Sequence, residues 1–245
     1  MIISPSIPLN CDGEFYHRLW SEEPGPDYAL STSGGTILPE LTTWTHAYAP
    51  LTYKDKWIWH MDRYQWDQQH QDLMPPQVII EESVQVGHCW SFTGPKGHIG
   101  IQLVVPVALT QITIYYPNAK QVLSSELRQA PQDIVVWALA QKETLSELGG
   151  DLVTRPANEF TQNTPTSLPA IQGGIMVALG NVTYRPEEGK RQSFALDKLL
   201  SLKSNVVVIE VTSNCGGDKT CLYRVAVHGK EETPLSTFQE EIKAL

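Results

Sequence analysis

Residues 97–116 carry the clearest periodic pattern in the chain, GHIGIQLVVPVALTQITIYY. Every second residue over 99–105 is a large apolar one, and the same period returns at Ile112 and Ile114. A period of two is typical of β-strands, because successive side chains point to opposite faces of a sheet. Pro106 lies between the two runs and cannot donate a backbone hydrogen bond. The pattern therefore predicts two strands with a break at the proline.

Four further runs are rich in β-branched and other apolar residues and end at turns that contain Pro, Gly, Asn or Lys: 133–139, 175–179, 206–212 and 222–227. The 17 prolines and 17 glycines are scattered between such runs, as in domains built from many short strands. The sequence lacks the alternation of strands and helices that would indicate a parallel nucleotide-binding sheet. We therefore predict an all-β sandwich.

Composition limits the class of protein. The chain has 245 residues, enough for one large domain or two small ones. Hydrophobic residues make up 41% and charged residues 18%, which excludes an intrinsically disordered chain. The formal net charge is −9 and there is no basic run, so a nucleic-acid partner is not expected.

Two stretches without charged residues, 97–119 and 160–184, raise the question of a membrane span. Neither holds the roughly 20 continuous apolar residues that crossing a bilayer requires. Prolines at positions 5 and 8 interrupt the apolar N-terminal segment, so we expect no secretory signal there. We expect a soluble domain, and any membrane anchor would lie outside this sequence.

Aromatic residues gather between positions 44 and 66, far above their 9% share of the chain. The segment holds Trp44, Tyr48, Tyr53, Trp57, Trp59, Tyr64 and Trp66. One interpretation is a flap that covers the sandwich, and this is favoured over a sugar-binding platform. The functional alternative is an exposed adhesive arm, because amphipathic aromatic side chains are frequent anchors at protein interfaces.

Both ends of the chain predict short helices. Thr233 can cap a helix, Pro234 suits the first helical position, and apolar residues follow at helical spacing. We assign residues 230–245 to a C-terminal amphipathic helix. Near the other end, Asp12 can cap a helix over residues 14–20.

The sequence holds none of the specific catalytic motifs, such as a nucleophile elbow, a zinc-protease helix or a phosphate-binding loop, so an enzyme is the weaker class. His88 and Cys89 could be written as a base and a nucleophile. Neighbours on a strand point to opposite faces, however, and a structural cysteine is the better interpretation. Asn181-Val182-Thr183 is a glycosylation sequon, a pattern so short that chance is its default explanation.

The four cysteines, Cys11, Cys89, Cys215 and Cys221, have no spacing typical of a zinc site. Their even number permits two disulfides, and buried free thiols are the alternative. Spacing alone does not determine which cysteines pair.

Four blocks in order resemble the SUN domain of the Sad1/UNC-84 family: DYALSTSGG at 27–35, CWSFTG at 89–94, APQDIVVW at 130–137 and TCLYRVAVHG at 220–229. The resemblance spans residues 27–229, with 1–26 left as an N-terminal extension. It implies a jelly-roll-like β-sandwich with a protruding lid hairpin and short terminal helices. It also implies a non-enzymatic domain in the perinuclear space, carried by an inner nuclear membrane protein. Such domains form homotrimers and bind the C-terminal KASH peptides of outer nuclear membrane proteins, as part of the LINC complex that positions nuclei.

The resemblance implies two functional segments. Residues 42–66, here called the lid segment, correspond to the KASH lid, which adds the bound peptide as an extra strand. Residues 78–88, here called the cation loop, correspond to a loop that holds a monovalent, potassium-like ion through main-chain carbonyls. By position these are the carbonyls of Val78, Glu81, Ser83, His88 and Tyr223. Calcium is a rival, because Glu81 and Glu82 could supply carboxylates.

The peptide's terminal carboxylate is expected near Tyr223, which the family shares, and near two replacements. Lys219 stands where the family has a tyrosine, and Gln129 where it has a serine. The expected peptide-binding set is Tyr223, Lys219, Gln129, Tyr116, Trp44, Tyr48, Tyr53 and Trp57.

The resemblance also implies a disulfide between Cys89 and Cys221, and it leaves Cys11 and Cys215 as a weaker candidate pair. Thr42 stands where animal members carry a cysteine that bonds to the peptide, so that intermolecular bond is not expected. Cys215 occupies a position that is usually tryptophan. These departures indicate a divergent member of the family, such as a fungal one. A carbohydrate-binding sandwich is the alternative function, since that fold is shared with sugar-binding modules and the lid segment is rich in Trp.

Overall fold

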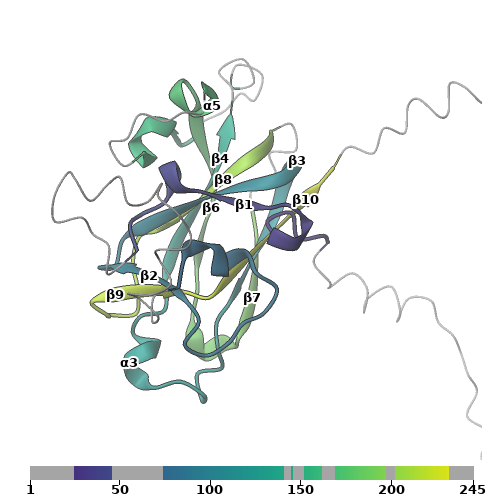
Figure 1. Ribbon diagram of the computed structural model, residues 1–245. Coiled ribbons are helices and arrows are strands. Elements are labelled where there is room, and N and C mark those ends of the chain that lie inside the picture. Colours follow the sequence, from purple (N-terminus) through teal and green to yellow (C-terminus); the bar gives the residue numbers. More distant parts are fainter. Residues whose placement is uncertain are drawn as a thin grey trace, which may run out of the picture.

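A computed structural model describes residues 25–45, 74–140, 145, 152–161, 169–196 and 202–231 (Figure 1). The predicted N-terminal helix, residues 232–245 of the predicted C-terminal helix and residues 46–66 of the lid segment lie outside the described residues. Lys230, which the prediction placed at the start of the C-terminal helix, is instead the last residue of strand β10 (Arg224–Lys230). The fold-class prediction is confirmed, because the described part is built mainly from antiparallel strands arranged as a sandwich. Among the described residues, no helix is both long enough and apolar enough to span a bilayer.

The longest strand, β3 (Gly97–Tyr115), runs through both predicted segments without a break. The prediction of two strands separated at Pro106 is therefore wrong. Strand β8 pairs with β3 at residues 97–102 and again at 107–108, and the register shifts between these stretches. Pro106 is exposed and lies inside this irregularity, where its missing N–H removes no ladder hydrogen bond.

One layer of the sandwich is a six-stranded antiparallel sheet that includes the first half of β3. Its order is β1 (Thr36–Leu38), β3, β8 (Lys203–Val211), β4 (Asp133–Ala140), β6 (Ile175–Thr183) and β5 (Thr154–Pro156). The predicted strands at 133–139, 175–179 and 206–212 correspond to β4, β6 and β8.

The second layer forms around the other half of β3. Strand β10 (Arg224–Lys230) pairs with residues 108–115 of β3, and β7 (Arg191–Ala195) pairs with residues 111–115. The main core contains inward residues of both layers, including Ile99, Ile112 and Val225, each fully buried. Because β3 belongs to both layers, it sets how the two sheets face each other.

A smaller core covers part of the outer face of the six-stranded sheet. Trp137 and Val208 lie on that face, and η2 (Pro39–Leu41), η6 (Ala157–Phe160) and α5 (Pro169–Gln172) supply the cover. Gly100 allows the close approach of η2, since a Cβ there would collide with Leu41. Burial on both faces explains why β8 reads as a nearly continuous apolar run.

A two-stranded ribbon, β2 (Trp90–Thr93) with β9 (Lys219–Leu222), stands apart from the large sheet. The predicted strand at 222–227 is in fact divided at Tyr223 between β9 and β10. The remaining described helices are short: η1 (Ser31–Ser33), η5 (Pro76–Ile80), α3 (Ser124–Leu127) and η7 (Pro186–Glu188). Figure 1 shows α3 beside β9 at one end of the molecule and α5 at the opposite end.

A mostly buried ion pair attaches the start of the described chain to β10. Asp27 Oδ2 lies 2.8 Å from Arg224 Nη2, and each side chain is only 11% exposed. Asp27 Oδ1 also accepts hydrogen bonds from the backbone N–H groups of Ala29 and Val227, both at 3.0 Å. The Arg224 guanidinium lies over the Tyr115 ring, with Cζ 4.5 Å from the centroid.

We expect Asp27→Asn to lower the free energy of unfolding by about 3 kcal/mol, because it leaves the Arg224 charge buried without its counter-ion. Denaturant unfolding measures this change. The matched control is Glu188→Gln, which removes an ion pair with Arg185 whose side chains are both 54% exposed. That control should cost less than about 1 kcal/mol. Equal losses in the two variants would contradict the role given to Asp27.

Candidate functional site

Tyr223 lies between β9 and β10 and contacts two other segments of the chain. Its ring packs edge-on against Tyr116, with centroids 4.7 Å apart, and Tyr116 in turn lies 6.1 Å from the Tyr184 ring. All three rings are buried. Burial raises the pKa of each phenol, so the three hydroxyls stay protonated at neutral pH and remain hydrogen-bond donors. Tyr184 was not predicted as part of this cluster.

A turn at the end of the cation loop contacts Tyr223. The N–H of His88 donates to the carbonyl of Gln85 at 3.0 Å, and Gly87, the third residue of this turn, has a φ of +85°, which favours glycine. The N–H of Gly87 donates to the Tyr223 hydroxyl at 3.2 Å. This contact was not predicted, although a glycine in an exposed loop is a signal for a tight turn.

The predicted cation ligands come from segments that the structure brings together. Val78 is buried in η5 and its carbonyl accepts the N–H of Glu81 at 3.3 Å, while Glu81, Ser83 and His88 are exposed. The hydrogen bond between Gly87 and Tyr223 joins this loop to the fifth predicted ligand. The described residues contain no group of three or more His, Cys, Asp or Glu side chains that could hold a metal ion. Cation binding by main-chain carbonyls stays a prediction.

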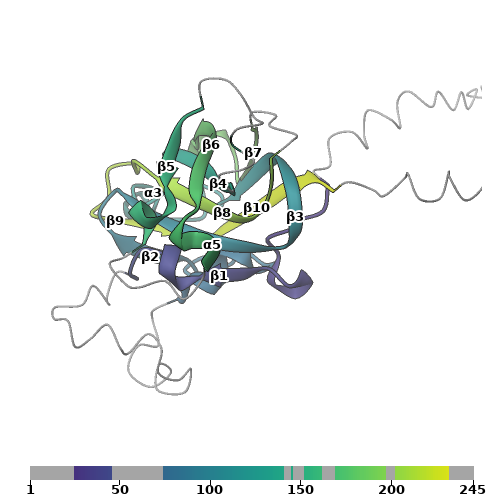
Figure 2. The same ribbon diagram turned by 90° about the horizontal axis from the view of Figure 1, so that it is seen from above.

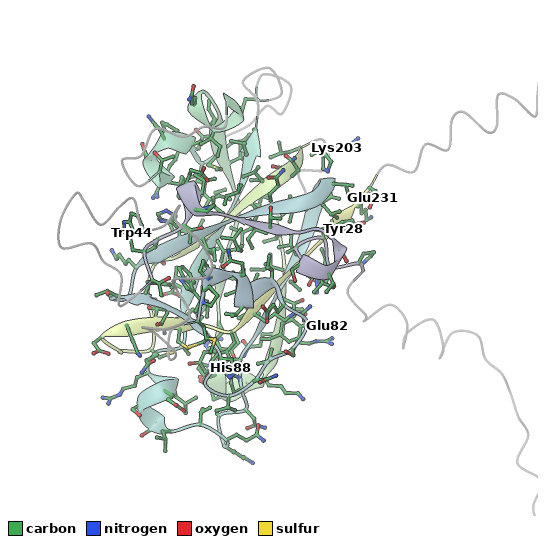
Figure 3. The ribbon with its side chains drawn as sticks, viewed as in Figure 1. Tyr28, Trp44, Glu82, His88, Lys203 and Glu231 are labelled. Atoms are coloured by element: carbon green, nitrogen blue, oxygen red, sulfur yellow. A yellow bond between two sulfur atoms is a disulfide. The ribbon has the colours of Figure 1, made fainter. Side chains whose placement is uncertain are left out.

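Cys89 and Cys221 form a disulfide, which confirms the predicted pair (Figure 3). Cys89 follows the cation loop directly, and Cys221 lies in β9 with its Cα 5.6 Å from that of Cys89. The bond joins residues 132 positions apart. It therefore fixes one end of the loop to the ribbon strand that leads to Tyr223.

The other predicted carboxylate contacts lie along β9. The N–H of Cys221 donates to the carbonyl of Gln129 at 2.8 Å, so the segment after α3 runs beside β9. Lys219 begins β9, is half-buried, and pairs with Thr93 of β2. Tyr116 donates its hydroxyl to the carbonyl of Glu126, in α3, at 3.0 Å. The structure thus brings these residues into one region, although their part in peptide binding stays a prediction.

The start of the lid segment belongs to the core, so the protruding lid that the resemblance implied does not begin at residue 42. Thr42 is 3% exposed, donates its hydroxyl to the carbonyl of Leu38 at 2.7 Å and accepts the N–H of Gly100 at 3.2 Å. Thr45 is fully buried and accepts the indole N–H of Trp90 at 3.0 Å. Because these hydroxyls satisfy buried donors and acceptors, residues 42–45 pack as a fixed base.

This base extends the ribbon. Thr45 forms an antiparallel bridge with Phe92 of β2, and Phe92 pairs with Thr220 of β9. Four segments therefore lie side by side: residue 45, β2, β9 and residue 129. Trp44 is half-buried within the base and is labelled in Figure 3, whereas Tyr48, Tyr53 and Trp57 lie outside the described residues.

Cys215 is a free thiol and is half-buried. Burial raises its pKa, and Glu187 and Asp133 add to that rise, so the thiolate is disfavoured. Its suggested partner, Cys11, lies outside the described residues.

The family model described as Sad1/UNC-like C-terminal matches residues 69–166 and 161–231. The chain belongs to this family. The resemblance to SUN domains is thereby confirmed. SUN domain-containing protein 5 of Mus musculus is 29% identical over 220 residues, which cover 89% of this chain and 48% of that protein. The Homo sapiens protein of the same name is 30% identical over 210 residues, covering 85% and 45%.

This SUN domain thus spans about half the length of these curated relatives. Among solved structures, the family 32 carbohydrate-binding module of Streptococcus pneumoniae EndoD matches at 10% identity with a TM-score of 0.49. The match covers 84% of this chain and 100% of that one. A likeness at this level carries no argument about function.

Removing the disulfide of this SUN domain with Cys89→Ser and Cys221→Ser should lower the free energy of unfolding by about 2–5 kcal/mol. The unfolded chain regains the freedom of a long closed loop, which makes unfolding more favourable. Denaturant unfolding without reductant measures the loss, and Cys215→Ser is the control because it removes a thiol outside the bond. Indistinguishable unfolding of the double variant and the control would contradict a stabilising disulfide.

Proposed function

We propose that this SUN domain is the luminal, non-enzymatic, peptide-binding module of a nuclear-envelope bridge. In this proposal it lies in the perinuclear space as part of an inner nuclear membrane protein. It holds the C-terminal KASH peptide of an outer nuclear membrane protein, transmits cytoskeletal force and so positions the nucleus. Family membership is the observation that carries the proposal. The geometry around Tyr223 adds a physical account of how a peptide end would be held.

The first element of the proposal is strand addition at the lid. A peptide that adds to a sheet gains main-chain hydrogen bonds and a defined register from the strand that it joins. That strand must itself be held in place if it is to fix the peptide. The core-packed base at residues 42–45, bridged through Thr45 to Phe92 of β2, meets that requirement. In the proposal, the aromatic residues Trp44, Tyr48, Tyr53 and Trp57 supply the side-chain pockets.

The second element is recognition of the terminal carboxylate. An anion that leaves water for a partly dry site needs donors in exchange for its lost hydration. The Tyr223 hydroxyl uses an acceptor lone pair for the N–H of Gly87, so its own hydrogen can donate to a carboxylate. In the proposal, Lys219 adds a positive charge and Gln129 an amide donor, with Tyr116 supporting the Tyr223 ring.

A KASH peptide with an amidated C-terminus should bind about tenfold or more weakly than the free acid, since losing a charge-assisted hydrogen bond costs roughly 1.5–3 kcal/mol. Tyr223→Phe should weaken the free acid to a similar degree. Tyr184→Phe is the matched control, because its hydroxyl donates to the carbonyl of Gly189 and not toward Gly87. Titration calorimetry measures the affinities, and light scattering with and without peptide reports whether trimers form.

Unchanged affinity after both amidation and Tyr223→Phe would show that the carboxylate site lies elsewhere. Weakening by Tyr223→Phe but not by amidation would instead assign the tyrosine to loop structure, through the lost contact with Gly87.

The third element is a potassium-like ion in the cation loop, held by the carbonyls of Val78, Glu81, Ser83, His88 and Tyr223. Carbonyl ligands without full charges suit a monovalent ion, whereas calcium favours a site with carboxylates. Potassium should therefore raise the melting temperature relative to a bulky organic cation at equal ionic strength.

The double variant Glu81→Gln and Glu82→Gln should keep this potassium effect, since it leaves every main-chain carbonyl in place. Stabilisation by calcium that disappears in the double variant would overturn the choice of ion. So would ligand distances near the roughly 2.3–2.6 Å of calcium in a crystal.

The carbohydrate-binding alternative is weaker. Membership of the Sad1/UNC-like family covers most of the chain, whereas the likeness to carbohydrate-binding modules rests on fold at 10% identity. A shared fold does not carry a binding site with it.

A further inference from the structure

The sequon Asn181-Val182-Thr183 lies on β6 and has no part in the proposed peptide site. Seven asparagines occur in the sequence, and only Asn181 is followed by a residue other than proline and then by Ser or Thr. A match to so short a pattern needs support from its surroundings. The structure supplies that support at the edge of the large sheet.

Asn181 is exposed although it lies inside a strand. On one side, β6 pairs with β4, where Asn181 is opposite Val135. On the other side, β5 pairs with β6 only at residues 175–177. Among the described strands, β6 is therefore the edge of the sheet at position 181. The alternation along the strand points Val182 into the main core and the side chains of Asn181 and Thr183 to the outer face.

The outer face changes from apolar to polar around this position, since Val135, opposite Asn181, packs against the smaller core. The Thr183 hydroxyl donates to Asp133 Oδ1 at 2.9 Å, and the Ser213 hydroxyl donates to Asp133 Oδ2 at 2.7 Å. These hydrogen bonds lower the pKa of Asp133, so the carboxylate is charged at neutral pH. The smaller core covers this face around Trp137, farther along β4. A bulky hydrophilic group on Asn181 would thus project into solvent beside charged and hydroxyl groups.

We propose that Asn181 is an N-glycosylation site that carries an oligosaccharide over the edge of the sheet. The inference rests on the luminal location in the proposed function, because the transfer takes place inside the endoplasmic reticulum, which is continuous with the perinuclear space. The donor is an oligosaccharide linked to a polyprenyl diphosphate. The Asn181 amide nitrogen forms a bond to the anomeric carbon, the bond from that carbon to the diphosphate oxygen breaks, and the nitrogen gives up one proton.

An oligosaccharide at position 181 would protect the exposed edge of β6. An edge strand exposes backbone N–H and C=O groups that can pair with the edge of another chain. A hydrophilic branch at residue 181 would block such pairing without disturbing the core side of β6. It would also account for an asparagine inside a strand, where this residue type is depleted.

The test has two arms. In the first, the chain is directed into the endoplasmic reticulum of eukaryotic cells by a cleavable signal, and in the second the complete natural protein is expressed in its own cells. In both, a gel shift removed by peptide-N-glycosidase should appear, and deglycosylation should convert Asn181 to Asp in the peptide identified by mass spectrometry. Asn181→Gln should abolish the shift, whereas Thr183→Ser should retain it because the hydroxyl is kept.

A second acceptor separates the possible failures. Glu188→Asn with Lys190→Thr creates a sequon on exposed residues around η7, away from the strand. If this acceptor is modified in the first arm and Asn181 is not, the inference is wrong and the proposed function stands. If both are modified in the first arm and neither in the second, the luminal location fails, and the proposed function fails with it.

Discussion

Strand β3 is paired on both edges along its two halves, and the rest of the sandwich depends on that constraint. Its first half lies between β1 and β8, and its second half between β10 and β7. Figure 2 shows the length of β3 relative to the strands around it. The change of partners occurs around Pro106, where the lack of an N–H is harmless because the register is already interrupted. One continuous strand thus orients both sheets. The inward-facing side chains of both sheets fill the core between them.

The candidate site depends on a second constraint, the attachment of the ribbon to segments distant in sequence. The disulfide between Cys89 and Cys221 joins the cation loop to β9, and the Gly87 N–H joins it to Tyr223. On the opposite edge of the ribbon, Thr45 bridges to Phe92 and forms a fixed base for the lid segment. A peptide that added to the lid and ended near Tyr223 would contact a platform held at both edges. Attachment at both edges would let the ribbon resist a pulling force on the bound peptide, as the proposed bridge requires.

Local patterns in the sequence were sufficient for the class of fold. Apolar runs that end at turn residues predicted the strands at 133–139, 175–179 and 206–212, and the apolar run of β8 reflected burial on both faces. The disulfide and the region around Tyr223 came from the resemblance to a family, since cysteine spacing alone left the pairing open. The base at residues 42–45 was missed, because threonine carries no apolar signal although Thr45 is fully buried.

By itself, the sequence determined the all-β class and the position of several strands, because an apolar period of two and short β-rich runs bounded by turn residues are properties of neighbouring residues. Tertiary structure decided what no local pattern contains: that β3 continues through Pro106, that Tyr223 divides β9 from β10, and that Gln129 lies beside Cys221. Each of these depends on hydrogen bonds between residues far apart in the chain. Whether a proline breaks a strand, or a hydroxyl can be buried, is settled by the partner groups across the sheet and not by the residue's own neighbours.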